Sequence, residues 1–90
     1  MYKVEYSSQF KKDFKKAKKR GLDQNRLKYI LDILVENGNL PSQFKPHKLK
    51  GKYNGLWECH IQPDWLLIWD QEDEIKLISL VRTGRHSDLF

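Results

Sequence analysis

The stretch that most constrains the fold is Trp65 to Trp69, which reads Trp-Leu-Leu-Ile-Trp. A strand with one face in water alternates apolar and polar side chains, and this stretch shows no alternation. It is also far too short to cross a lipid bilayer. We therefore predict a central β-strand, Trp65 to Asp70, that is covered by other parts of the protein on both faces.

Three further segments have the composition of strands. Leu56 to Ile61 and Glu74 to Thr83 are rich in β-branched, aromatic and aliphatic residues. The turn residues 62–64 and the acidic turn 71–73 separate them from the central segment. Near the N-terminus, apolar and polar residues alternate over 2–6, which is typical of a half-buried strand.

Two amphipathic helices are predicted between the first strand and the others, each with a capping residue before it and a glycine after it. The first helix has the candidate caps Ser7 and Ser8, the apolar stripe Phe10, Phe14 and Ala17, and the stop Gly21. The second has the cap Asp23, a staple of Leu22 with Leu27, the stripe Leu27, Ile30, Leu31 and Leu34, and the stop Asn37-Gly38. The short connection predicts an antiparallel helical hairpin.

The element order is therefore βααβββ, which predicts an α+β fold: a small, antiparallel-rich sheet with the N-terminal helical hairpin on one face. Pro41 and Pro46 make 39–55 irregular, with room for one extra short strand near Leu49 to Tyr53 and a hairpin turn at Asn54-Gly55. With 90 residues and no repeat or linker, the chain is expected to form a single domain over residues 1–90.

Positive charge is concentrated in two blocks. Residues 1–20 hold eight Lys or Arg against two acidic residues, and residues 45–52 hold four Lys and no acid, within a net charge of +5. Such blocks suit a polyphosphate partner, although they are also compatible with a solvated helix face that confers only solubility. The single cysteine and the absence of a signal peptide or spanning segment predict a cytoplasmic protein with no membrane partner.

The three histidines, His47, His60 and His86, are the candidates for proton transfer, because imidazole titrates near neutral pH. His60 and Asp64 flank a turn that contains Pro63, so the carboxylate could approach the imidazole ring. Alternatively, Asp64 caps the turn through its own backbone. A zinc site at Cys59, His60 and Asp64 is disfavoured because no further ligand completes a tetrahedral set, and a nucleophilic Cys59 is equally disfavoured.

The motifs of the second half of the chain resemble the YafQ branch of the RelE/ParE toxin superfamily. They are His47-Lys48-Leu49-Lys50-Gly51, then Cys59-His60-Ile61-Gln62-Pro63-Asp64-Trp65-Leu66-Leu67-Ile68-Trp69, then Arg82-Thr83-Gly84-Arg85-His86-Ser87-Asp88-Leu89-Phe90. Each motif alone is only weak evidence for the family. The order of the motifs, their spacing and the ending on Leu-Phe are together strong evidence for it. The N-terminal strand and basic helix pair extend the resemblance over nearly the whole chain.

The resemblance implies a toxin of a type II toxin–antitoxin system that cleaves mRNA in the ribosomal A site without a metal or other cofactor. It implies two protein or ribonucleoprotein partners: the 70S ribosome with its mRNA, and an antitoxin protein that has an acidic segment and a DNA-binding domain. Operator DNA would be bound only through the antitoxin. The family's catalytic positions fall on His47, His60, Asp64 and His86. Trp65 and Phe90 are implied as accessory members of the site.

The expected reaction is attack of an RNA 2′-hydroxyl on the adjacent phosphorus, with a base, an acid and cations assisting. We assign His60 with Asp64, and His47 as a further member, to the base side, and His86 to the acid side. Candidate phosphate contacts are Arg82, Arg85, Lys48 and Lys50. Phe90 could stack on a base or plug the core, and Trp65 is expected to support the site by packing.

Two other functions remain open from the sequence. The first is a non-catalytic basic module that binds ribosomal RNA or an acidic protein through the first helix and the 45–52 loop. The second is a ParE-like gyrase inhibitor on the same fold, against which the full set of histidines argues. Under the preferred function, the ribosome-binding candidates are the lysines of the first helix: Lys11, Lys12, Lys15, Lys16, Lys18 and Lys19.

Overall fold

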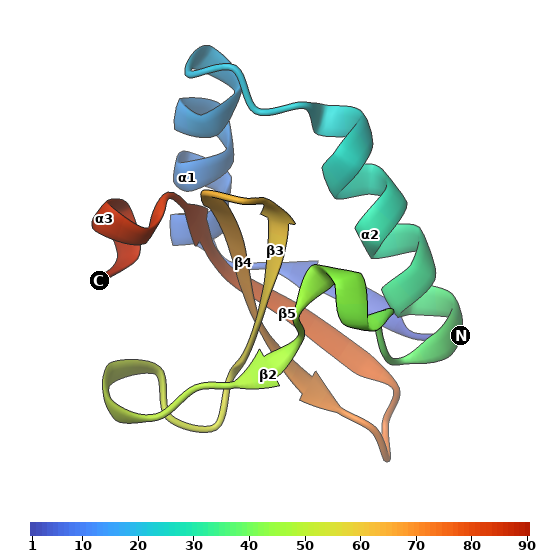
Figure 1. Ribbon diagram of the computed structural model, residues 1–90. Coiled ribbons are helices and arrows are strands. Elements are labelled where there is room, and N and C mark those ends of the chain that lie inside the picture. Colours follow the sequence, from blue (N-terminus) through green and yellow to red (C-terminus); the bar gives the residue numbers. More distant parts are fainter.

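The protein is a five-stranded mixed sheet flanked by helices (Figure 1), and the computed structural model describes residues 1–90. The strand order is β1-β5-β4-β3-β2, in which β1 runs parallel to β5 and the other neighbours are antiparallel. The strands are β1 (Lys3–Tyr6), β2 (His47–Lys48), β3 (Trp57–Gln62), β4 (Trp65–Glu72) and β5 (Leu77–Gly84). The predicted α+β class with an antiparallel-rich sheet is confirmed. None of the helices is long and apolar enough to span a membrane.

Strand β4 is covered on both faces, as predicted. Leu67 and Trp69 belong to the main core, which α1 (Ser8–Lys19) and α2 (Gln24–Asn37) build against one face of the sheet. Leu66 and Ile68 belong to a second cluster on the opposite face, where Tyr53 and Leu89 cover them. This second layer comes from the loop before β3 and from the C-terminal helix α3 (His86–Leu89).

The caps of the two long helices lie where the sequence predicts them. The Ser7 hydroxyl accepts a hydrogen bond from the Phe10 N–H, and the Asp23 carboxylate accepts one from the Asn25 N–H. Gly38 ends α2 with a φ of 73°, and a Cβ on it would lie 2.6 Å from the Tyr2 hydroxyl oxygen. Glycine is therefore required at position 38 both by the backbone conformation and by the packing of the first strand.

The extra short strand differs in position from the prediction. It is β2, at His47–Lys48, whereas 51–53 forms one turn of 3-10 helix. The chain loops out here because Tyr53 is drawn into the second cluster, where only 8% of it is exposed. Asn54 and Gly55 do turn the chain, with a φ of 86° at Gly55, but inside this wider loop and not as a two-residue hairpin.

Strand β5 also departs from the prediction at its start and in its middle. It begins at Leu77 and not at Glu74, because Lys76 has a φ of 54°, outside the strand region. A bulge then leaves Val81 without a partner between the pairs Trp69–Leu80 and Ile68–Arg82. The Val81 carbonyl instead accepts a hydrogen bond from the Ser7 hydroxyl, 2.8 Å away.

Candidate active site

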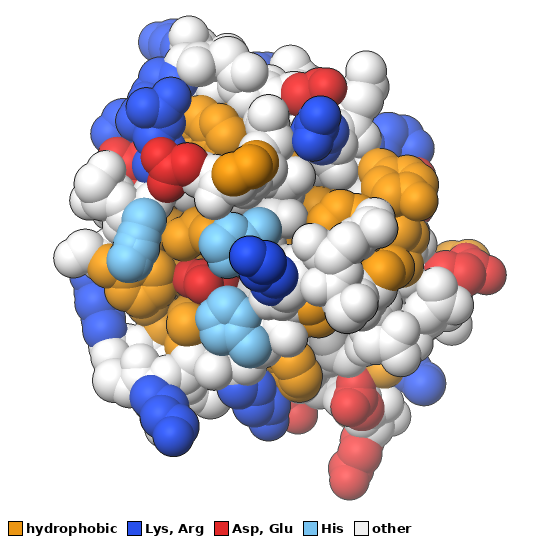
Figure 2. Space-filling model, viewed as in Figure 1, with side chains coloured by type: hydrophobic (Ala, Val, Ile, Leu, Met, Phe, Trp, Pro, Cys, Tyr) orange, Lys and Arg blue, Asp and Glu red, His pale blue; other side chains and the backbone are white.

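All three histidines of the chain lie on one face of the molecule, and Figure 2 shows them grouped there with acidic atoms between them. The pairing of β2 with β3 sets His47 directly opposite Glu58, and opposed residues of an antiparallel pair share a face. His60 follows two residues after Glu58 on the same strand, so it lies on that face too.

His47 and Glu58 form a pair that joins β2 to β3. The His47 Nε2 lies 3.2 Å from Glu58 Oε1, and its Nδ1 lies 2.7 Å from the Lys45 carbonyl oxygen. Both ring nitrogens face oxygen atoms, and only the doubly protonated ring can donate to both. Glu58 is 5% exposed, and its second oxygen, Oε2, is buried without a hydrogen-bond partner. This carboxylate is thus held in the sheet chiefly by a histidine.

His60 is oriented by the turn that follows it. Its Nδ1 lies 3.2 Å from the Pro63 carbonyl oxygen, which can only accept a hydrogen bond. The proton is therefore assigned to Nδ1, and the lone pair to Nε2. The structure records no hydrogen bond between His60 and Asp64, because the backbone carbonyl of Pro63, in the same turn, contacts the His60 Nδ1 instead.

Asp64 instead contacts the C-terminal helix. Its Oδ1 accepts a hydrogen bond of 3.3 Å from the backbone N–H of His86, so it links the β3–β4 turn to α3. Asp64 and His86 are therefore neighbours, although 22 residues separate them in the sequence. The expected site residues are brought together in two groups: His47 and His60 along β2 and β3, and Asp64 with His86 at the tail.

Helix α3 is a single turn that is anchored at its N-terminal end by Asp88. Asp88 Oδ2 accepts hydrogen bonds of 2.9 Å from the Arg85 N–H and from Nη1 of Arg20, the residue that follows α1, and Lys16 of α1 approaches Oδ1 at 3.9 Å. The Arg85 N–H and the Arg20 guanidinium hold the pKa of Asp88 below its ordinary value. The tail that carries His86 is thus tied to the basic helix α1.

Leu89, and not Phe90, plugs the core at the end of the chain. Leu89 is 1% exposed, whereas Phe90 is 55% exposed. The Phe90 ring stacks on the His86 ring at 4.9 Å between centroids and meets the Tyr53 ring edge-on at 5.4 Å. An exposed aromatic ring beside an imidazole suits the stacking of a single-stranded base.

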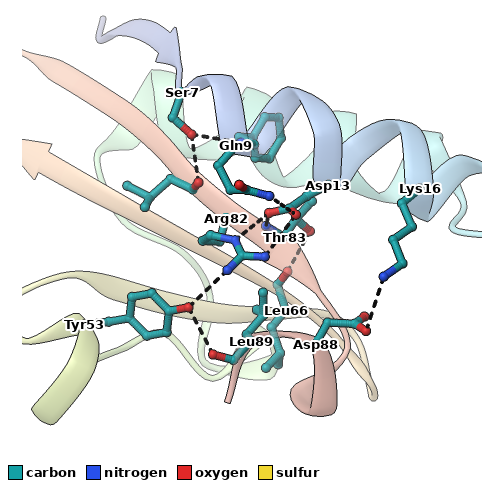
Figure 3. A network of polar contacts seen from close by, with 12 residues as sticks. Ser7, Gln9, Asp13, Lys16, Tyr53, Leu66, Arg82, Thr83, Asp88 and Leu89 are labelled. Atoms are coloured by element: carbon teal, nitrogen blue, oxygen red, sulfur yellow. Dashed lines mark hydrogen bonds and ion pairs between the residues drawn. The ribbon is translucent and has the colours of Figure 1, made fainter.

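Two of the candidate phosphate contacts are placed differently from the expectation. Arg82 is bound by Asp13 of α1, with Nε to Oδ2 at 2.8 Å and Nη2 to Oδ1 at 3.1 Å (Figure 3). The Asp13 carboxylate raises the pKa of Arg82 further, so this guanidinium stays charged and engaged within the fold. Lys48 lies opposite Trp57, on the other side of β2 from His47, and its ammonium sits 5.7 Å from that ring.

The other cationic and aromatic candidates keep surface or supporting positions. Lys50 and Arg85 are exposed, and the Arg85 guanidinium lies 5.4 Å over the Trp65 ring. Trp65 is 7% exposed within the main core, and the guanidinium of Arg20, the residue after α1, lies 5.5 Å from the same ring. Trp65 therefore supports Arg85, the residue before His86, by packing against its side chain.

The six lysines of α1 are all exposed: Lys11, Lys12, Lys15, Lys16, Lys18 and Lys19.

Cys59 is fully buried, and burial raises the pKa of its thiol to about 12. A thiol that stays protonated is a poor nucleophile, in agreement with the sequence analysis. No three His, Cys, Asp or Glu side chains are grouped as the ligands of a metal ion would be.

Sequence reasoning missed Glu58 and Tyr53. Glu58 was overlooked because an acidic residue in a basic protein is ordinarily solvated. The available signal was its position two residues before His60 on a predicted strand. Tyr53 lay in a segment expected to be irregular, and nothing local to it shows that it packs against the C-terminus.

The family of the chain follows from comparison with known proteins. Residues 2–90 match the family model described as the bacterial toxin of a type II toxin-antitoxin system, YafQ. The match defines the class as toxins of type II toxin–antitoxin systems. Within that class, the chain belongs to the YafQ family, which confirms the resemblance found in the sequence. A relative from Escherichia coli, the mRNA interferase toxin YafQ, is 44% identical over 88 residues, which are 97% of this chain and 94% of the relative.

Solved structures agree with the same assignment. The crystal structure of YafQ from E. coli has a TM-score of 0.90 and 42% identity, over 100% of this chain and 99% of that one. YafQ in the E. coli DinJ–YafQ complex has a TM-score of 0.88 and 43% identity, over 100% and 99% of the two chains. A metal-bound toxin from Helicobacter pylori has a TM-score of 0.89 and 37% identity, over the whole of both chains.

Proposed function

We propose that the protein is an mRNA interferase, an endoribonuclease that cleaves mRNA in the ribosomal A site by general acid–base catalysis. The observation that carries this proposal is the gathering of every histidine of the chain on one face of the molecule, with an exposed aromatic ring stacked on one of them. The E. coli relatives, which are named mRNA interferase toxins, support the same class of reaction.

His60 is the base in this proposal. Its Nδ1 proton is held by the Pro63 carbonyl, so its Nε2 lone pair is free to take the proton of an RNA 2′-hydroxyl. The 2′-oxygen then attacks the adjacent phosphorus, the bond from phosphorus to the 5′-oxygen breaks, and a 2′,3′-cyclic phosphate forms. His86 donates the proton that the departing 5′-oxygen requires. Asp64 positions His86 by accepting a hydrogen bond from the backbone N–H of His86. In this proposal Asp64 therefore acts on His86 and not, as the sequence suggested, on His60.

His47 supplies positive charge beside the phosphate in this scheme. When its ring carries both protons, it can donate on one side to the Lys45 carbonyl and on the other to Glu58, and these two contacts hold the ring in place. Charge that develops on the phosphate oxygens is stabilised by a cation already held in place. Among the other cations, Arg85 and Lys50 remain candidates for phosphate contacts, whereas Arg82 has only Nη1 outside its pair with Asp13.

We propose two macromolecular partners: the 70S ribosome with its mRNA, and a cognate antitoxin. The antitoxin is supported by the E. coli relative, which is solved in complex with DinJ. An acidic segment of the antitoxin would complement the net charge of +5, and operator DNA would be reached only through the antitoxin. The ribosome is supported by the exposed lysines along one helix.

The test of the function is to express the protein in cells and map mRNA 5′ ends. Cuts at fixed codon positions in translated messages, which disappear when translation initiation is blocked, are the expected result. Arrest of growth with intact messages and inhibited gyrase would instead indicate a ParE-like toxin. Binding to ribosomes with neither cleavage nor gyrase inhibition would indicate a non-catalytic module.

Charge reversal on α1 should separate ribosome binding from catalysis. Lys12→Glu with Lys19→Glu changes two exposed side chains, so the fold should be kept while ribosome affinity falls and its dependence on salt flattens. The matched control is Lys3→Glu with Lys76→Glu, which makes the same change of charge away from α1. Co-sedimentation with 70S ribosomes over a salt series measures the effect, and equal loss in both double variants would remove the assignment to α1.

A further inference from the structure

We propose that Tyr53 is a positioning residue that sets the geometry of His86 and Phe90 through its hydroxyl group and its ring. The inference rests on the proposed function for its catalytic consequence, but the structural link it describes can be measured separately. Tyr53 lies outside the motifs that carry the family resemblance, between the second and third strands.

Tyr53 contacts the end of the tail in two ways. Its hydroxyl donates a hydrogen bond of 3.0 Å to the carbonyl oxygen of Leu89, in a buried setting (Figure 3). Its ring meets the Phe90 ring edge-on, with the centroids 5.4 Å apart and the planes at 87°. Since Phe90 stacks in turn on His86, Tyr53 is one ring away from the proposed acid.

The tail depends on such contacts because α3 has only four residues. An isolated helix of that length is not stable in water, so tertiary contacts must fix its position. Asp88, with Arg85 and Arg20, fixes the N-terminal end of α3, and the buried side chain of Leu89 holds its last residue. Tyr53 is the residue that donates a hydrogen bond to the Leu89 carbonyl and packs against the Phe90 ring.

The orientation of the Tyr53 hydroxyl is itself fixed by Arg82 of β5. Arg82 Nη1 donates to the Tyr53 hydroxyl at 3.5 Å, while the rest of the guanidinium is held by Asp13 of α1. The donated hydrogen bond leaves the hydroxyl proton to point at Leu89, so Asp13, Arg82, Tyr53 and the tail form one connected series. This explains why Arg82 is engaged within the fold and why Tyr53 is 8% exposed in a loop.

Tyr53→Phe tests the proposal because it removes the hydroxyl and keeps the ring. We expect single-turnover cleavage on saturating ribosomes to slow by about ten- to a hundredfold, which is the scale of a misplaced catalytic group. Ribosome affinity should not change, since the effect is on the step after binding. The control is Tyr29→Phe, the same chemical change on a tyrosine that is 56% exposed on α2.

Nuclear magnetic resonance supplies the readout that a purely structural role would not move. In Tyr53→Phe the nuclear Overhauser contacts between the His86 and Phe90 rings should weaken, and the α3 amides should exchange faster, while the amide spectrum of β4 stays native. Wild-type cleavage by Tyr53→Phe, or a slower rate with unchanged ring contacts, would overturn the proposal. If the wild-type protein itself does not cleave, the proposed function fails, and the ring contacts still decide whether Tyr53 positions the tail.

Discussion

His86→Ala is expected to slow single-turnover mRNA cleavage by about 10²–10⁴-fold, the usual contribution of a positioned acid or base. The protein should keep its fold, because His86 is exposed and its ring contacts only the exposed Phe90 among the aromatic side chains. Ribosome and antitoxin binding should also be kept. Growth arrest should disappear when the variant is expressed without antitoxin.

Ser87→Ala is the matched control, because it truncates the neighbouring exposed residue on the same short helix. It should cleave like the wild type. Wild-type cleavage by His86→Ala on saturating ribosomes would show that the tail supplies no catalytic group. The acid would then have to be sought elsewhere, first at His47, whose Nε2 lies beside Glu58.

Glu58→Met is expected to raise stability and lower activity together. The buried carboxylate has one oxygen without a partner, and methionine removes this unsatisfied group, whose burial costs about 1–3 kcal/mol, while the 47%-exposed His47 side chain that remains can be hydrated. Activity should fall by about ten- to a hundredfold, because the His47 ring loses the Glu58 oxygen that holds its Nε2 in place. Chemical denaturation and single-turnover cleavage measure the two effects.

Glu58→Gln separates charge from shape, since it retains an oxygen that can accept a hydrogen bond from His47. Glu74→Met, in the exposed turn before β5, controls for the loss of one negative charge. A Glu58→Met protein that is less stable yet fully active would mean that the His47–Glu58 pair serves only to join β2 to β3. The combination predicted here is typical of a residue retained for function at a cost in stability.

Those parts of the fold that depend on local sequence could be predicted. The unbroken apolar run of β4 indicated burial on both faces, and Ser7, Asp23 and Gly38 marked helix ends through their own hydrogen bonds and backbone angles. In each case the physical cause lies within a few residues of the signal. The family motifs added the set of histidines, whose roles remain proposals.

The contacts that sequence reasoning missed are all non-local. His47 meets Glu58 only because β2 pairs with β3, and Asp64 meets His86 only because the tail returns to the β3–β4 turn. The bulge at Val81 likewise decides that Arg82 turns to Asp13 of α1. Such pairings depend on how the whole chain closes, and periodicity along a single strand carries no information about them.

The parallel pairing of β1 with β5 has a consequence for how the protein is made. Lys3 lies beside Leu77, so the first strand has no partner until the last strand, β5, has been synthesised. A nascent chain therefore carries β1, α1 and α2 without a complete sheet to pack on until residues 77–80 have emerged from the ribosome. Because contacts between distant parts of a sequence form slowly, the closure of this edge of the sheet is expected to be a late and slow step of folding.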